Sequence, residues 1–205
     1  MTPLLALLLT LALSYSVGGI SGGWILVRLA GRGDLRTQGS GVTGATNAGR
    51  VMGTRGFLVV MLFDAAKAAA AVVVAQKVVA GPWAHLAFPA VVAGHIWPPW
   101  LRFKGGRGAA PLLGGLIAFN PILAGASVAV GLAVIAVSRK RFLGSAVAFS
   151  ASLLLQAWMI GDGPNRFCYL LSCGLVVLAH RGHIAQIVRP PHGAEHGIQG
   201  RGDRG

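Results

Sequence analysis

The chain has 205 residues, of which 54% are hydrophobic and only 11% are charged. Soluble proteins carry about 25% charged residues, and a soluble chain of this size must still cover a large wetted surface. The mean hydropathy of +0.67 therefore excludes a soluble globular domain and indicates a membrane protein. The net charge of +13 comes from residues that separate apolar runs, a pattern that argues against nucleic acid as a partner.

Residues 3–29 form the first apolar run, and no charged residue precedes Arg28. Because a secretory signal has a basic amino end and a small-residue cleavage site, we expect a permanent first membrane span instead. The following loop, 30–55, is polar and rich in glycine, and several arginines follow the span closely. The positive-inside rule then places the amino terminus outside and this loop in the cytoplasm.

Five further apolar runs follow at 56–80, 83–100, 109–137, 142–160 and 166–179. If each run crossed the membrane once, the basic residues 139–141 would lie outside, against the positive-inside rule. The run 109–137 is long for one span, and Pro121 disfavours helix at Asn120. A split of the run at this point adds one membrane crossing, which places all the basic segments on the cytoplasmic side. We therefore predict an all-α integral membrane protein of about seven transmembrane helices with short cytoplasmic Gly-rich loops.

The predicted transmembrane domain covers residues 1–188 and forms a single unit. The tail 189–205 is rich in proline and glycine and lacks apolar periodicity. Such a composition cannot bury enough apolar surface to fold, so we predict a disordered cytoplasmic tail.

A few residues within the apolar runs have a structural interpretation. Cys168 and Cys173 match no zinc or redox spacing, and we expect free, buried thiols. Asp64 and Lys67 lie three residues apart on one face of the second span, which predicts an ion pair within the membrane. For His95, we favour a packing or capping role.

The first Gly-rich segment, GSGVTG at 39–44, matches the letters of the dinucleotide fingerprint GxGxxG. That motif functions between a strand and a helix, whereas a membrane helix precedes this segment. Glycines permit turns whose backbone N–H groups converge on an anion, and nearby arginines supply planar donors for phosphate. The residues expected to form this part of a phosphate site are Gly39, Ser40, Gly41, Thr43, Gly44, Thr46 and Asn47. The open alternative is a flexible basic loop that touches anionic lipid headgroups.

The second Gly-rich loop, FKGGRG at 103–108, places cations among glycines directly before a predicted helix. Helix amino ends attract anions, and the GKS or GKT ending of a Walker loop is absent. We assign to the phosphate site Lys104, Gly105, Gly106, Arg107 and Gly108. Taken alone, this loop is also typical of a solvated positive-inside linker.

Two histidines, His180 and His183, lie three residues apart at the cytoplasmic end of the last span. This spacing suits a metal ion, but the pair supplies only two ligands and no carboxylate clearly completes the set. We therefore assign no metal site and no cofactor. No Ser-His-Asp arrangement identifies a catalytic base either.

Four motifs, GSGVTGATNAGRVMG at 39–53, FDAAK at 63–67, GHIWPPWLRFKGGRGAA at 94–110 and AHRGHI at 179–184, together carry a family resemblance. The chain resembles the bacterial acyl-phosphate:glycerol-3-phosphate acyltransferases (PlsY) as a divergent member. The resemblance implies a seven-helix enzyme of the bacterial inner membrane with its active site toward the cytoplasm. It also implies acyl transfer from acyl phosphate to glycerol 3-phosphate, which forms lysophosphatidic acid in the first acylation step of phospholipid synthesis.

The resemblance further implies roles for individual residues and names the partners as acyl phosphate, glycerol 3-phosphate and membrane lipids. The positions that match the family's phosphate-surrounding residues are Ser40, Asn47, Arg50 and His180, taken as catalytic, with Arg107 and His183. In the implied mechanism, a substrate phosphate rather than a protein side chain accepts the proton of the attacking hydroxyl.

The chain departs from the family pattern at four positions. Val42 and His183 each replace an asparagine, Arg107 replaces a lysine, and Gly144 stands where serine is usual. Arg107 keeps the positive charge, whereas Val42 has no hydrogen-bonding side chain. Two alternatives stay open: a divergent paralogue with another acceptor or little activity, and a non-catalytic phosphate- or lipid-binding membrane protein or transporter.

Overall fold

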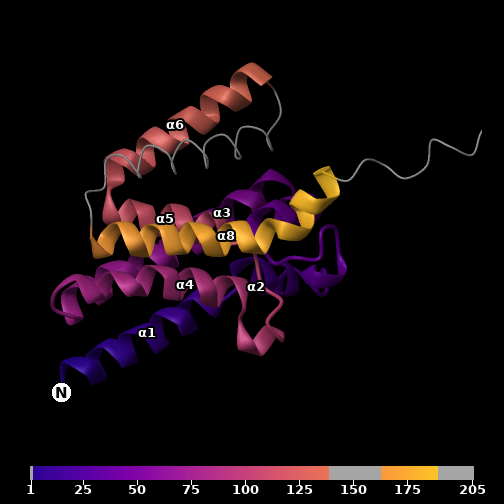
Figure 1. Ribbon diagram of the computed structural model, residues 1–205. Coiled ribbons are helices and arrows are strands. Elements are labelled where there is room, and N and C mark those ends of the chain that lie inside the picture. Colours follow the sequence, from indigo (N-terminus) through magenta and orange to yellow (C-terminus); the bar gives the residue numbers. More distant parts are fainter. Residues whose placement is uncertain (1, 139–162, 189–205) are drawn as a thin grey trace, which may run out of the picture.

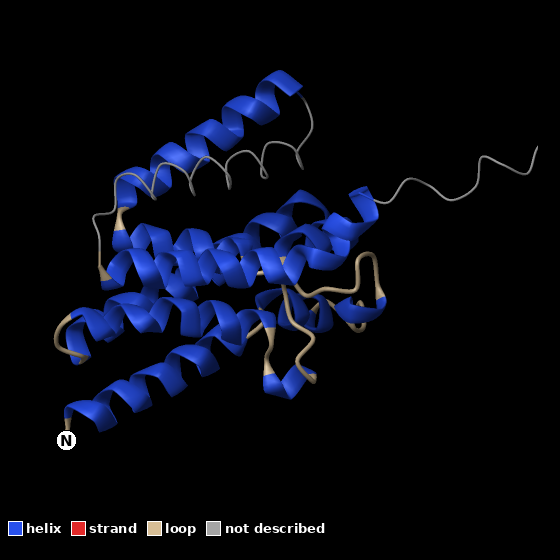
Figure 2. Ribbon diagram, viewed as in Figure 1, coloured by secondary structure: helices blue, strands red, loops and turns tan. Residues whose placement is uncertain are grey.

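The structure is a computed structural model that describes residues 2–138 and 163–188, and these ranges contain helices and no strands (Figure 2). The elements are α1 (Pro3–Gly19), α2 (Gly22–Leu29), η1 (Leu35–Thr37), α3 (Ala45–Val78), η2 (Pro82–Leu86), α4 (Ala87–Ile96), η3 (Pro99–Leu101), α5 (Ala109–Phe119), α6 (Pro121–Ser138) and α8 (Pro164–Val188). The all-α class is confirmed for this part of the chain. The basic residues 139–141, Gly144, the predicted span 142–160 and the tail 189–205 lie outside the described residues.

Apolar side chains cover the outer faces of the long helices. Two helical segments, Pro3–Leu29 and Ala45–Val78, are long and apolar enough to cross a membrane. Along α1, Leu4 and Leu13 are each 65% exposed, and Leu62 of α3 is 63% exposed. Large exposed apolar surfaces are uncommon on soluble monomers, so these faces suit contact with lipid.

The first predicted span, 3–29, is two helices rather than one. The chain leaves the helix at Ile20, whose φ and ψ are −64° and 102°. Two residues that are distant in sequence donate hydrogen bonds to the carbonyl groups freed by this break. Trp100 Nε1 donates to Gly19 O at 3.0 Å, and Lys67 Nζ donates to Ile20 O at 2.6 Å. These two hydrogen bonds therefore stabilise the break between α1 and α2.

The predicted split at Asn120–Pro121 is confirmed. Asn120 ends α5 with φ and ψ of −153° and 92°, and α6 begins at Pro121. The Asn120 side chain then accepts a hydrogen bond from Leu123 N at 3.1 Å, which satisfies one of the free N–H groups at the start of α6.

Two other predicted boundaries are wrong. The loop predicted at 30–55 is shorter, because α3 already begins at Ala45 and includes polar residues that bind the loop before it. The run 83–100 is not one continuous α-helix, because Trp97 leaves α4 with φ and ψ of −125° and 62°. Pro98 explains this end, since proline disfavours helix at the residue before it.

Glycines bring the helix backbones close together. Gly18 and Gly94 lie at the contact between α1 and α4, and Gly114 lies at the contact between α5 and α3; a Cβ at each would overlap the facing backbone. Small residues allow this close approach between membrane helices. A buried cluster that includes Phe88 and Tyr169 then joins α3, α4, α5, α6 and α8.

The predictions for residues inside the bundle agree with the structure. Cys168 and Cys173 are free and buried. Asp64 and Lys67 form the predicted ion pair, with 2.6 Å between Oδ1 and Nζ. His95 is buried as well, and its Nδ1 lies 3.2 Å from Lys67 Nζ.

The two Gly-rich loops gather at one end of the bundle. Figure 1 shows the amino terminus of α1 at the opposite end, and it shows α8 running back toward the loops beside α4 and α5. Figure 2 shows the loops before α3 and before α5 together at this end. The predicted site residues of both loops and of the carboxyl end of α8 are thus carried to the same side of the molecule.

Candidate active site

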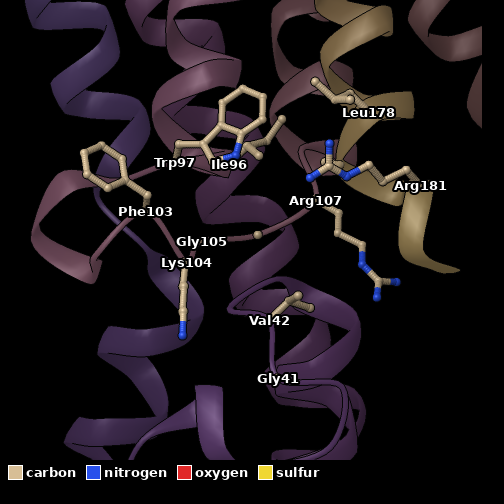
Figure 3. Close-up of a pocket in the computed structure, with 12 residues that line it drawn as sticks. Gly41, Val42, Ile96, Trp97, Phe103, Lys104, Gly105, Arg107, Leu178 and Arg181 are labelled. Atoms are coloured by element: carbon tan, nitrogen blue, oxygen red, sulfur yellow. The ribbon is translucent and has the colours of Figure 1, made fainter.

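A cavity of about 330 Å³ opens between the two Gly-rich loops, the end of α4 and α8 (Figure 3). Five of the predicted site residues line it, namely Gly41, Lys104, Gly105, Gly106 and Arg107. None of the other predicted residues whose side chains the structure describes lines this cavity.

The first loop is organised by the side chain of Asn47, which is fully buried. Its Oδ1 accepts a hydrogen bond from Ser40 N at 2.9 Å. Its Nδ2 donates to Leu35 O at 3.1 Å, Gln38 O at 2.8 Å and Val42 O at 2.9 Å. An amide nitrogen has two hydrogens, and both are used by these carbonyls. Asn47 therefore positions the loop, and the catalytic role that the resemblance implies for it stays a prediction.

Gly39 shows why this loop needs glycine. Its φ is +57°, and a Cβ would overlap Oδ1 of Asn47. A positive φ is costly for residues other than glycine, so both the backbone conformation and the close approach exclude a side chain here. Gly41, which lines the cavity, also has a positive φ, +71°.

The second loop is hydrogen-bonded to the end of α4 and to the first loop. Gly105 N donates to Ile96 O at 3.1 Å, and Gly106 N donates to His95 O at 3.0 Å. Thr43 N, from the first loop, donates to Gly105 O at 3.2 Å. The two loops thus form one connected backbone structure.

Each loop ends at the amino terminus of a helix. Gly44 is the N-cap of α3 and Gly108 is the N-cap of α5, and neither provides a side-chain cap. Thr46, in the first turn of α3, is exposed. Helix amino termini carry a partial positive charge and N–H groups without helical partners. Both termini therefore favour an anion such as phosphate at the loops.

Two arginines act on each other beside the cavity. Burial lowers the pKa of the Arg107 guanidinium, and the positive charge of Arg50 lowers that pKa further. Among the ion pairs of the described residues, none involves Arg50 or Arg107. Two guanidinium groups that repel each other and lack a carboxylate partner favour a bound anion.

Arg36 has a different function. Its Nη2 lies 2.6 Å from Asp34 Oδ2, and its Nη1 donates to Leu101 O at 3.0 Å. The hydrogen bond from Arg36 lowers the pKa of the Asp34 carboxyl to about 2. This pair joins the first loop to η3 and leaves Arg36 with an internal counter-ion.

The carboxyl end of α8 contributes a residue that the sequence analysis missed. Arg181 lines the cavity, and the only sequence signal for it is its place directly after His180 in the AHRGHI motif. His180 does not line the cavity, but its Nδ1 lies 2.8 Å from Val176 O. A carbonyl only accepts, so Nδ1 is the protonated nitrogen in this contact. His183 belongs to α8, and its side chain is outside the described residues.

The remaining wall of the cavity is mostly apolar. Its apolar side chains are Val42, Ile96, Trp97, Phe103, Leu178 and Ala179. Figure 3 shows Val42 between the side chains of Lys104 and Arg107 in this view. The cavity thus combines cationic groups with an apolar surface, an arrangement suited to a phosphate joined to a hydrocarbon.

A family model described as glycerol-3-phosphate acyltransferase matches residues 8–190. The chain belongs to this family. Glycerol-3-phosphate acyltransferase 1 of Desulfitobacterium hafniense is 39% identical over 176 residues, which cover 85% of this chain and 87% of the relative. The glycerol-3-phosphate acyltransferase of Cereibacter sphaeroides is 39% identical over 184 residues, which cover 90% and 87%.

Solved structures agree with the membership in the glycerol-3-phosphate acyltransferase family. The glycerol 3-phosphate form of PlsY, an integral membrane acyltransferase, matches with a TM-score of 0.81 at 29% identity and covers 89% of this chain and 92% of that one. Its lysophosphatidic acid form matches with a TM-score of 0.79 at 27% identity, covering 89% and 91%. The family resemblance is confirmed, and the chain is an integral membrane protein of the acyltransferase family.

Proposed function

We propose that the chain transfers an acyl group from an acyl phosphate to glycerol 3-phosphate and forms lysophosphatidic acid. The observation that carries this proposal is the cavity in which Arg107, near Arg50, has no carboxylate partner among the described residues. Solved forms of PlsY with glycerol 3-phosphate and lysophosphatidic acid support this acceptor and this product.

In the proposed reaction, a hydroxyl oxygen of glycerol 3-phosphate attacks the carbonyl carbon of the acyl phosphate. The bond from that carbon to the phosphate oxygen breaks, and inorganic phosphate leaves. A phosphate oxygen of the substrates accepts the hydroxyl proton, so the protein supplies no general base. Lys104, Arg107 and Arg50 hold the phosphates in position, and donors at the site stabilise the charge that grows on the carbonyl oxygen.

Ser40, His180 and His183 complete the proposed site as polar groups. The contact of His180 Nδ1 with Val176 O makes Nδ1 the donor and sets the ring orientation. The neighbouring Arg181 lines the cavity, which supports a role for this end of α8 next to the substrates.

We propose that the active site faces the cytoplasm from the bacterial inner membrane, with the amino terminus outside. The gathering of both cationic loops at the end opposite the amino terminus of α1 supports this orientation. A single cysteine in place of Thr2 should react with an impermeant reagent on intact cells, and one in place of Gln38 only after lysis. The opposite labelling pattern would reverse the orientation.

Val42 supports a second candidate, transfer to an acceptor other than glycerol 3-phosphate. This residue lines the cavity without any hydrogen-bonding side-chain group, and it stands where the family pattern has asparagine. Such an acceptor would still carry a phosphate for Arg107 to bind.

The deciding experiment supplies the purified full chain with labelled acyl phosphate and a panel of phosphorylated alcohols. We expect labelled lysophosphatidic acid from glycerol 3-phosphate and release of one inorganic phosphate per product. Arg107→Ala is the matched control and should lower product formation. Product from another phosphorylated alcohol alone would select the second candidate, and no transfer from acyl phosphate would refute both.

A further inference from the structure

Three buried polar side chains lie behind the second Gly-rich loop and outside the cavity. Asp64 and Lys67 belong to α3, and His95 belongs to α4; they are 0%, 8% and 3% exposed. Ionisable groups inside a membrane protein are costly to bury. The ion pair of Asp64 with Lys67 lowers this cost, but it does not explain why His95 is buried beside the pair and in contact with it.

The Lys67 ammonium has three hydrogens and finds three acceptors. It lies 2.6 Å from Asp64 Oδ1, 2.6 Å from Ile20 O and 3.2 Å from His95 Nδ1. Because an ammonium group only donates, Nδ1 of His95 accepts and its proton is on Nε2. Asp64 and the helix break at Ile20 hold Lys67, and Lys67 in turn sets the orientation of the His95 ring.

The His95 ring lies directly against Gly106. A Cβ on Gly106 would overlap the ring, at 2.7 Å from Cε1 and 3.0 Å from Cδ2. The backbone of the same histidine accepts a hydrogen bond from Gly106 N at 3.0 Å. His95 therefore determines the position of Gly106 through its ring and its carbonyl group, and the next residue in the chain is Arg107.

We infer that Asp64, Lys67 and His95 form a positioning cluster that holds the second Gly-rich loop where Arg107 meets the substrate phosphate. The inference rests on the phosphate site of the proposed function. An ion pair that served only to pack helices would require neither the bond to His95 nor the close contact of its ring with Gly106. The three residues act through Arg107 and do not touch the substrates.

The test measures glycerol 3-phosphate affinity by calorimetric titration, together with KM, kcat and Tm, for the purified full chain and its variants. His95→Leu removes the acceptor and the ring, whereas His95→Asn keeps an acceptor oxygen near the place of Nδ1. Ser127→Ala is the matched control, because this buried hydroxyl bonds to Leu123 O of its own helix, 2.8 Å away, and to no other group among the described residues. We expect at least about tenfold weaker affinity and higher KM in His95→Leu, since small displacements of a binding group cost that much or more.

His95→Asn should recover part of the lost affinity, and Ser127→Ala should keep wild-type values. The double variant Asp64→Asn with Lys67→Met leaves no unpaired buried charge but no longer orients the ring. It should raise KM as well, and it decides the question if His95→Leu does not fold. Folded variants that keep wild-type affinity and KM, or that lower Tm alone, would overturn the inference.

The binding measurement separates this inference from the proposed function. A wild-type chain that forms lysophosphatidic acid while all cluster variants keep its KM would refute the cluster alone. A wild-type chain that binds glycerol 3-phosphate without transfer, and loses this binding in His95→Leu, would refute the reaction and support the cluster. A wild-type chain that binds no glycerol 3-phosphate would overturn the inference.

Discussion

Replacing Asn47 by aspartate is the most direct perturbation of the first Gly-rich loop. The change keeps an acceptor for Ser40 N but replaces the donor group Nδ2 by an oxygen. The carbonyls of Leu35, Gln38 and Val42 then lose their donor and face a second oxygen, in a site with no solvent exposure. The loop can no longer keep this conformation at low cost.

The structure sets the expected magnitude of this change. A net hydrogen bond contributes about 1 kcal/mol, and a buried polar group left without a partner costs about 1–3 kcal/mol. The loss of one donor group shared by three carbonyls therefore costs about 3–4 kcal/mol, and this corresponds to about 10²–10³ in the population of the ordered loop. Glycerol 3-phosphate affinity should fall by a similar factor, because only the ordered loop binds well.

Limited proteolysis with an arginine-specific protease measures the order of this region directly, since Arg32 and Arg36 lie just before the first Gly-rich loop, in the segment between α2 and α3. We expect faster cleavage in Asn47→Asp. The unfolding of the helices should change little, because their packing contacts lie outside this loop. Asn120→Asp is the matched control, because aspartate keeps the acceptor for Leu123 N. Wild-type cleavage and wild-type affinity in Asn47→Asp would refute the donor role of this amide.

Three further outcomes are expected. Arg107→Ala should weaken glycerol 3-phosphate binding about 10- to 100-fold, since charge-assisted hydrogen bonds contribute about 1.5–3 kcal/mol. Arg107→Lys should keep part of the affinity. Equal binding by the wild type and both variants would remove Arg107 from the site. Val42→Asn should raise the rate of lysophosphatidic acid formation, because the amide adds hydrogen-bond donors to the cavity wall. A variant that reacts more slowly than wild type would indicate that the apolar side chain is itself required. Asp34→Asn should lower Tm at neutral pH, and the difference from wild type should shrink as pH falls from 3.8 through about 2, because a carboxyl whose pKa is lowered by folding stabilises only above that range. A difference that does not shrink over this range would contradict the role of the Asp34–Arg36 pair.

The fold was predictable where a local signal decides the structure. Pro121 ends α5 because proline restricts the residue before it, and the spacing of Asp64 and Lys67 determines that they share a helix face. Both predictions follow from short segments. The break at Ile20 was not predictable in this way, because its carbonyl accepts a hydrogen bond from a lysine 47 residues later in the chain.

The candidate site shows the same division. The glycines and cations of the two loops were recognisable from composition and order, and five of them line the cavity. The role of Asn47 was not recognisable from the sequence, because its partners are backbone carbonyls whose positions only the folded loop determines. Arg181 and the contact of His95 with Gly106 depend on how α8 and α4 meet the loops in space.

The hydrogen bond from Thr43 N to Gly105 O has a consequence for how this family can change its sequence. Both partners are backbone atoms, so no replacement of a side chain removes the bond, and among the standard amino acids only proline at position 43 lacks the donor. Neighbouring positions such as Val42 and Arg107 can accumulate substitutions while the two loops stay joined. Divergence at the cavity wall is thereby separated from the integrity of the framework that carries it.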